Sequence, residues 1–348
     1  MYHRTTLKNG LRIITVPKKD SLSVNLLVLV SVGTDHETKA VNGISHFLEH
    51  MSFKGTAKRP RAIDLSSELD SLGAEYNAFT GREYTGYYVS CLPDKLDQAL
   101  DILADMYLNP FFDEHEADKE RGVIGEEINR SFDNPSRRVQ DIFSELIYGD
   151  TSYGWSTLGT KATLKDINRP EFLAFRKKHY HAKNTVVAIA GDLEHLEITA
   201  KVERYFSALA AGRREPKEKI IERQTKPALR LEFHPGQQTN IVLGFRSVGS
   251  SHKDYYPALI LAGILGGTMS SRLFQKVREE MGAAYSIGAY QASFAKHGYL
   301  GISAGVETKR LEEVLRVILA ETAKLKVDLV DEKELARTKD VFIGSTYL

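Results

Sequence analysis

Cysteine is almost absent from this chain of 348 residues, since Cys91 is the only one. A single cysteine excludes an internal disulfide and any site that needs several thiolates. No apolar run reaches the roughly 18 residues of a membrane-spanning helix, and the first ten residues lack the apolar core of a signal peptide. We therefore expect a cytoplasmic protein that does not enter the membrane.

The chain also has almost no excess of charge of either sign. Lysine and arginine together number 47 and aspartate and glutamate 46, which gives a formal net charge of +1. Bulk charge therefore offers no attraction to nucleic acid or to a membrane surface, and we expect neither as a partner. With 42% hydrophobic residues, the chain is long enough for two domains with cores of their own.

A linker-like composition in residues 208–219, which include Ala-Ala-Gly-Arg-Arg-Glu-Pro, predicts a boundary between domains 1–210 and 220–348. The first part alternates strand and helix patterns. We expect strands at residues 11–16, 24–32, 75–80 and 85–92. We expect helices at residues 43–50, 62–72, 96–108, 114–129, 174–180 and 196–206.

The two parts share short sequence patterns, which indicates an internal duplication. Ser-Val-Gly at 31–33 recurs at 247–249 and Gly-Ala-Glu-Tyr at 73–76 recurs as Gly-Ala-Ala-Tyr at 282–285, while 96–103 resembles 311–318. The offset stays near two hundred and twelve residues. Each part is then one α+β unit in which helices pack on a sheet.

Residues 46–50 read His-Phe-Leu-Glu-His, the most informative pattern in the chain. On a helix, His46 and His50 lie one turn apart on the same face and can bind one zinc ion. Glu49 stands beside His50, where it can reach a water molecule on the metal. This is the inverted form of the usual zinc-protease motif, and it predicts a hydrolase.

A catalytic zinc ion takes three protein ligands, so one more is needed. The acidic stretch 113–128 offers several candidates on one helical face, including Glu120 and Glu127. The residues alone do not choose among them, because a charge run of this kind is more often a solvated helix surface.

The block at 43–56, followed by Glu120 and Glu127, resembles the pitrilysin and mitochondrial-processing-peptidase family of zinc peptidases. The similarity continues through residues 76–80, 83–85, 158–160, 184–192 and 270–274. It implies an α+β fold of two tandem homologous α/β sandwich domains, each an antiparallel-rich sheet packed with helices, of the LuxS/processing-peptidase-like type.

The same resemblance implies roles for individual residues. The family's third zinc ligand lies seventy-seven residues after the second histidine, which is Glu127, and a supporting glutamate lies seven residues earlier, which is Glu120. It implies one Zn²⁺ per chain and an inactive second domain, whose Arg278 and Tyr285 hold the substrate and stabilise the oxyanion across a closed chamber.

The resemblance also implies how substrate and partner chains bind. A peptide substrate is expected to add as an extra strand to the edge formed by Asn77 and Ala78. A chamber of four half-units further implies a homodimer, or a heterodimer with a related subunit. Because family members continue beyond the helix expected from Asp331, the second domain is expected to be truncated here.

Two other readings compete with a zinc endopeptidase acting on peptides or small unfolded proteins. A non-catalytic partner or substrate-binding subunit of the same family would keep the fold, but such members typically lose the zinc motif. A structural or storage zinc protein is disfavoured because structural sites usually have a fourth protein ligand, often cysteine. Gly266-Gly267 lacks the following Gly-Lys-Ser/Thr of a phosphate-binding loop.

Overall fold

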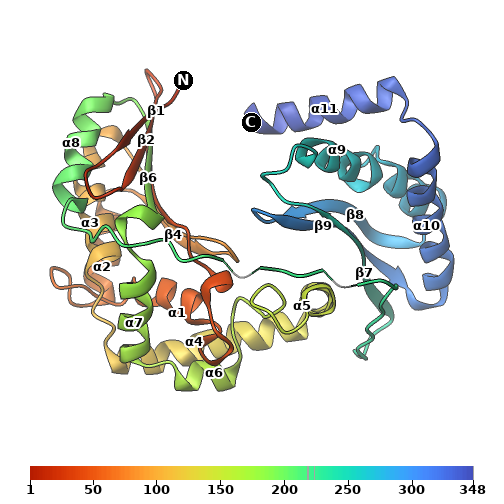
Figure 1. Ribbon diagram of the computed structural model, residues 1–348, viewed down its shortest axis with the longest axis horizontal. Helices are drawn as coiled ribbons and strands as arrows, with labels where there is room; N and C mark the ends of the chain where they lie inside the picture. The colour runs from red at the N-terminus through yellow and green to blue at the C-terminus, as the bar shows by residue number, and fades with distance from the viewer. Residues whose placement is uncertain (218, 223, 348) are drawn as a thin grey trace. The chain divides into compact units, whose positions relative to one another are not determined.

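The computed structural model describes residues 1–217, 219–222 and 224–347 (Figure 1). The chain divides into two units. The first comprises Met1–Arg130 and Ile147–Ile221, and the second comprises Ser131–Leu146 and Glu222–Leu348. A short stretch from the middle of the chain therefore belongs to the second unit, which the sequence patterns did not predict.

The first unit contains a six-stranded sheet with the order β1-β2-β6-β3-β5-β4. Only the β2–β6 pair is parallel, and the other neighbours are antiparallel. The strands are β1 His3–Thr6, β2 Arg12–Pro17, β3 Val24–Val30, β4 Glu75–Thr80, β5 Thr85–Cys91 and β6 Thr185–Gly191. The four strands predicted in this unit are thus confirmed to within two residues.

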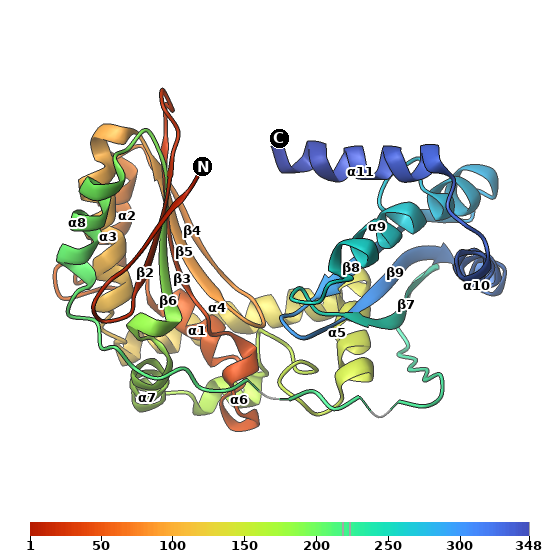
Figure 2. The ribbon, with the colours of Figure 1, turned by 45° about the horizontal axis from the view of Figure 1, so that its top comes forward.

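Alternating burial in the strands turns one face of this sheet towards a helical layer. In β3, every second residue from Val24 to Val30 is buried, as expected for a strand with one face on a core. Figure 2 shows helices α3 and α8 along the same face of the sheet. The core between them contains fully buried Val28, Leu100 and Phe206.

The helices of the first unit mostly agree with the predicted segments. They are α1 Ile44–Met51, α2 Ala62–Ser71, α3 Leu96–Leu108, α4 Glu114–Asp133, α6 Lys161–Asp166, α7 Arg169–His179 and α8 His195–Phe206. The prediction placed the start of α7 at residue 174, which is wrong. The helix begins at Arg169 because Pro170 occupies its first turn, where a missing N–H costs nothing, and Asn168 caps it.

The second unit contains a three-stranded antiparallel sheet with the order β7-β9-β8. Its elements are β7 Gln238–Val248, α9 Tyr255–Gly266, a π-helix Phe274–Glu280, β8 Ala284–Ser293, β9 His297–Glu307, α10 Leu311–Val327 and α11 Glu332–Tyr347. A buried core joins β9 to α10 through Ile302, Val306, Val314 and Ile318. The helix expected from Asp331 is confirmed as α11.

Most of helix α5, Pro135–Tyr148, lies in the stretch Ser131–Leu146, which belongs to the second unit. The Phe143 ring packs edge-on against Tyr299 of β9, with 5.0 Å between ring centroids. Gly244 of β7 faces the same ring, and a Cβ atom there would lie 2.2 Å from Phe143. Helix α5 was not among the helices predicted from the sequence, although its amphipathic pattern is typical of a helix with one buried face.

The order of elements supports the duplication. In both units a strand is followed by a helix, a second helix, an antiparallel strand pair and a long helix. The strand order β3-β5-β4 corresponds to β7-β9-β8. None of the helices that the structure describes is long and apolar enough to cross a membrane.

Candidate metal centre

Helix α1 carries both histidines and is fixed at its first turn by a buried carboxylate. Glu37 accepts hydrogen bonds from the backbone N–H groups of Gly43 at 2.8 Å and Ser45 at 2.9 Å, and from the Asn42 side chain. A carboxylate at this end satisfies N–H groups that have no helical partner. Burial is the main influence on the pKa of Glu37 and raises it, although these hydrogen bonds act in the opposite direction.

Gly43, which precedes α1, has φ +96° and lies against the loop that contains Gly159. A Cβ atom on Gly43 would lie 2.8 Å from the Leu158 carbonyl oxygen and from Gly159 Cα. Only glycine accepts both the left-handed backbone and this approach. The start of the metal helix is therefore held by backbone geometry as well as by Glu37.

His46, His50 and Glu127 form a cluster whose ligand atoms all lie within 4.8 Å of one another. The two Nε2 atoms are 3.2 Å apart, and Glu127 Oε2 lies 3.5 Å from His46 Nε2 and 3.8 Å from His50 Nε2. Tetrahedral zinc with bonds near 2.0–2.1 Å requires ligand separations of about 3.3 Å. The three atoms therefore fit a single zinc ion, which agrees with the ligand set expected from the resemblance.

Glu120 supports this cluster from α4, the helix that also carries Glu127. His50 Nδ1 donates to Glu120 Oε1 at 2.7 Å, which leaves Nε2 of the same ring available for a metal ion. The Lys54 ammonium contacts the other carboxylate oxygen at 2.6 Å. Burial would raise the pKa of Glu120, but the hydrogen bonds from His50 and Lys54 outweigh it and lower the pKa.

The two histidines differ in their electrostatic surroundings. Burial, reinforced by the nearby charge of His50, lowers the pKa of His46 to about 4. His46 is therefore neutral at pH 7, the form that binds metal. For His50, burial is opposed by Glu120 and Glu127, and the pKa lies above its usual value. The Nδ1 atom of His46 is buried and has no hydrogen-bond partner among the residues that the structure describes.

Glu49 lies on α1 between the two histidines in sequence and is half-buried. The hydroxyl of Thr80, at the end of β4, donates to its Oε2 atom. Burial is the largest influence on the pKa of Glu49 and raises it, while the Thr80 hydrogen bond acts in the opposite direction. Thr80 was not recognised as a site residue from the sequence, because only the fold brings the end of β4 next to α1.

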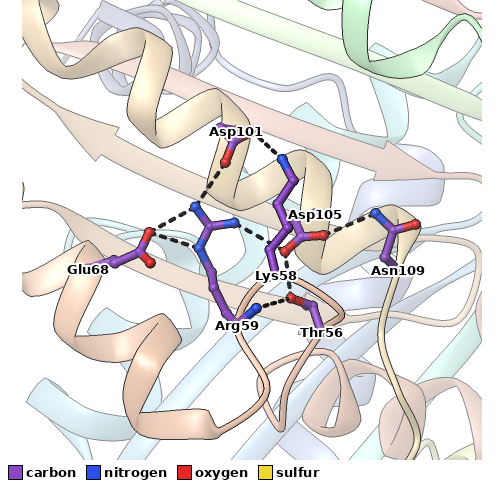
Figure 3. A network of polar contacts seen from close by, with 7 residues as sticks. All are labelled: Thr56, Lys58, Arg59, Glu68, Asp101, Asp105 and Asn109. Carbon is purple, nitrogen blue, oxygen red and sulfur yellow. Dashed lines mark hydrogen bonds and ion pairs between the residues drawn. The ribbon is translucent and has the colours of Figure 1, made fainter.

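The loop that follows α1 is tied to α3 by a buried guanidinium. Arg59 contacts Glu68 and Asp101 at 2.8 and 2.9 Å, and Asp105 at 3.1 Å, as Figure 3 shows. Thr56 adds a hydrogen bond to Asp105, whose side chain is only 1% exposed. This network fixes the chain segment that leaves the metal helix.

The remaining predicted residues lie on β4 and in the second unit. Asn77 and Ala78 are on β4, which is an edge strand of the six-stranded sheet. The Ala78 N–H donates to the Asn77 side chain at 2.8 Å. Arg278 lies in the π-helix with its guanidinium 4.8 Å from the centre of the Phe274 ring, and Tyr285 on β8 is 83% exposed.

Comparison with known protein families agrees with this geometry. Residues 12–161 match the model of insulinase, peptidase family M16, and residues 166–342 match the model of the peptidase M16 inactive domain. The chain belongs to peptidase family M16. The match to the inactive domain begins at residue 166, within the first unit, and continues to residue 342, and this stretch has no counterpart of the histidine motif.

Bacterial relatives of this M16 chain carry names that refer to zinc. It is 37% identical to the uncharacterized zinc protease YmxG of Bacillus subtilis, over 100% of this chain and 84% of that protein. It is 38% identical to an uncharacterized zinc protease of Rickettsia felis, over 97% of this chain and 81% of that protein.

Two solved structures have the same fold. A protease from Helicobacter pylori matches with a TM-score of 0.90 at 23% identity, over 100% of this chain and 85% of that chain. A peptidase M16 inactive domain from Pseudomonas fluorescens matches with a TM-score of 0.89 at 22% identity, over 99% of this chain and 84% of that chain. These likenesses establish the α+β architecture.

Proposed function

We propose that this M16 protein is a zinc-dependent endopeptidase that hydrolyses peptides or small unfolded proteins. The observation that carries the proposal is the cluster of His46, His50 and Glu127 with Glu49 on the same helix as the histidines. The names of the relatives, which are uncharacterized zinc proteases, support zinc as the metal of the proposed enzyme. A cytoplasmic location, expected from the sequence, is part of this proposal.

His46, His50 and Glu127 would hold the zinc ion. When bound, the metal acts as a Lewis acid that lowers the pKa of water and polarises the scissile carbonyl. Glu120 orients the His50 ring through Nδ1 and so keeps Nε2 directed at the metal position. Lys54 neutralises part of the charge on Glu120 and holds its carboxylate in place.

Glu49 takes the proton of the attacking water and later passes it to the amine that leaves. Its environment suits this role, because partial burial removes the carboxylate from bulk water and favours proton uptake. The Thr80 hydroxyl holds one carboxylate oxygen and leaves the other for the proton transfer.

The substrate would add to the edge of β4 as an antiparallel or parallel strand. Main-chain hydrogen bonds would then provide most of the affinity, and side-chain pockets would provide preference. At Ala78 the backbone N–H is covered by the Asn77 side chain, and we propose that a peptide carbonyl displaces that amide. Binding of this kind tolerates many sequences.

We propose further that the enzyme is a homodimer in which Arg278 and Tyr285 complete the site of the partner chain. Two inactive chains, Glu49→Gln and Tyr285→Phe, test this when mixed. Mixed dimers would contain one zinc centre with Glu49 opposite one intact Arg278 and Tyr285 pair, so part of the activity should return. No recovery, in mixtures that contain heterodimers by native mass, would contradict the shared site.

The substitution Glu49→Gln tests the proposed function directly. It removes the base and none of the ligands, so hydrolysis of a quenched peptide should fall about 10²–10⁴-fold while zinc content stays unchanged. Glu126→Gln is the matched control, because Glu126 is exposed on α4 beside Glu127 and should leave the rate as it was. A Glu49→Gln chain with activity within a few-fold of wild type would exclude Glu49 as the base.

A further inference from the structure

A second cluster of charge lies in the first unit, away from the metal centre. An open hollow of about 460 Å³ contains four arginines and one lysine, and its lining comprises Arg4, Thr6, Gly10, Arg12, Lys183, Arg213 and Arg214. None of the described residues that line it is acidic or aromatic. In a chain with a net charge of +1, this is a strong local concentration of positive charge.

The cations of this hollow lack counter-ions among the residues that the structure describes. None of the four arginines and the lysine forms an ion pair with a residue that the structure describes. The Nε atom of Arg12 is buried and has no hydrogen-bond acceptor there. Burial, followed by the charges of Arg214 and Arg4, lowers the pKa of Arg12. An unpaired buried donor among like charges destabilises a fold unless a ligand satisfies it.

Backbone hydrogen bonds bring together two of the segments that carry these cations. The chain after α8 pairs with the 3₁₀ turn Ala182–Asn184 that precedes β6, since the Ala182 N–H donates to the Ala210 carbonyl at 2.8 Å and the Lys183 N–H donates to the Ala211 carbonyl at 3.2 Å. Arg214 Nε donates to the Lys183 carbonyl at 2.8 Å. Three separate segments therefore present their cations on one preorganised surface.

Gly10, in the turn between β1 and β2, makes room for one of these cations. Its φ is +94°, and a Cβ atom there would lie 2.8 Å from Lys183 Cγ. The lysine stem lies across the turn because the residue is glycine. Lys183 and Gly10 both line the hollow.

We propose that this hollow binds a compact oligophosphate anion. Arginine forms bidentate hydrogen bonds with phosphate, and five cations in one hollow suit a ligand that concentrates several negative charges in a small volume. Isolated carboxylates supply less charge in the same space. The absence of aromatic rings from the described lining leaves nothing to stack on a nucleobase, so the phosphate chain itself is the ligand.

This site is independent of the proposed peptidase activity. The hollow lies at the β1–β2 edge of the sheet, whereas α1 contacts β4 at the opposite edge. Occupation by an anion would satisfy Arg12 and relieve repulsion among the arginines. Because only the folded chain presents the cluster, binding should also raise the thermal stability of the protein.

Titration calorimetry of the full chain with inorganic tripolyphosphate tests the proposal. We expect binding that weakens as salt increases and that falls at least tenfold in Arg12→Gln/Arg214→Gln. Lys183→Gln should weaken binding several-fold. The control Lys19→Gln removes one exposed charge from the same unit and should change affinity less than twofold. Zinc content, measured before and after titration, separates binding from removal of metal.

Two results would overturn the proposal. Tripolyphosphate that binds the double variant as tightly as wild type, with both proteins folded by circular dichroism, would show that the hollow is not the site. An oligoglutamate of similar charge that binds as tightly as tripolyphosphate, with the same loss in Lys183→Gln, would overturn the assignment to phosphate. The peptidase assay plays no part in either result.

Discussion

Helices α1 and α9 follow equivalent strands in the two units, but only α1 carries metal ligands. Helix α1 displays His46 and His50 on one face and is anchored by Glu37. Helix α9 is apolar on all sides and ends at Gly266. Both units therefore have a helix at the same place in the fold, next to an antiparallel strand pair. The side chains on that helix, and not the fold, decide whether it can bind a metal ion.

The segments that hold the two helices also differ. In the first unit, Arg59 joins three carboxylates and is itself only 8% exposed. In the second unit, Arg272 forms a bidentate pair with Glu334, and the buried Glu321 pairs with two lysines, Lys276 and Lys324. The cation of these networks is thus more deeply buried in the unit with the metal site than in the second unit, a difference that substitutions can measure.

The largest effect should follow from loss of Arg59. Arg59→Ala leaves the buried Asp105 carboxylate without a cation and should lower the free energy of unfolding by about 3–5 kcal/mol. Arg272→Ala, whose partner is more exposed, should cost clearly less. Denaturant unfolding of both variants measures the comparison, and equal losses would remove the distinction between the two networks.

A second prediction distinguishes the zinc ligand Glu127 from Glu120, which orients the ligand His50. Glu120→Gln should weaken zinc binding about 10–100-fold, and Glu127→Gln should weaken it by more than that because it removes a ligand. Competition with a zinc chelator measures both affinities. A greater loss in Glu120→Gln than in Glu127→Gln would reverse the assignment of the two glutamates.

The smallest predicted effect is a loss of folding stability at acidic pH. Burial, with the charge of His36 next in importance, lowers the pKa of His179 in the first unit to about 4 from 6.5. The unfolded chain then binds a proton that the folded chain does not, so stability is lost as the pH falls below the unfolded pKa. Between pH 7 and 5.5 this residue should cost about 1 kcal/mol.

His179→Gln provides the matched variant for this prediction, because it keeps a polar side chain but cannot titrate. Its free energy of unfolding should change less than that of wild type over the same pH interval. The comparison is made by denaturant unfolding at each pH. A parallel pH dependence in the two proteins would show that His179 does not carry the effect.

Local patterns predicted the part of the site that lies on one helix. His46, Glu49 and His50 are four residues or fewer apart, so helical geometry alone brings them together. Glu127 was different, because the acidic stretch left several candidates open and the family resemblance selected one. The contact between Thr80 and Glu49 could not be predicted, since it depends on how β4 packs against α1.

The prediction of the fold succeeded where local sequence patterns decide the structure, and it failed where contacts between distant residues decide it. The strands predicted in the first unit could be recognised from their sequence patterns, and in β3 every second residue is indeed buried. The start of α7 was missed by five residues, since the helix includes Pro170, which is accepted in a first turn. The grouping of α5 with the second unit depends on the fit of Phe143 against Gly244, a contact across about one hundred residues.

The central claim is that the first unit holds one zinc ion through His46, His50 and Glu127. Metal analysis of the purified chain, reconstituted with zinc and freed of excess, tests it most directly. The account predicts about one zinc ion per chain, loss of zinc in His46→Ala and in His50→Ala, and no change in His115→Ala, whose side chain is 77% exposed. Zinc content that is equal in all four proteins would contradict it.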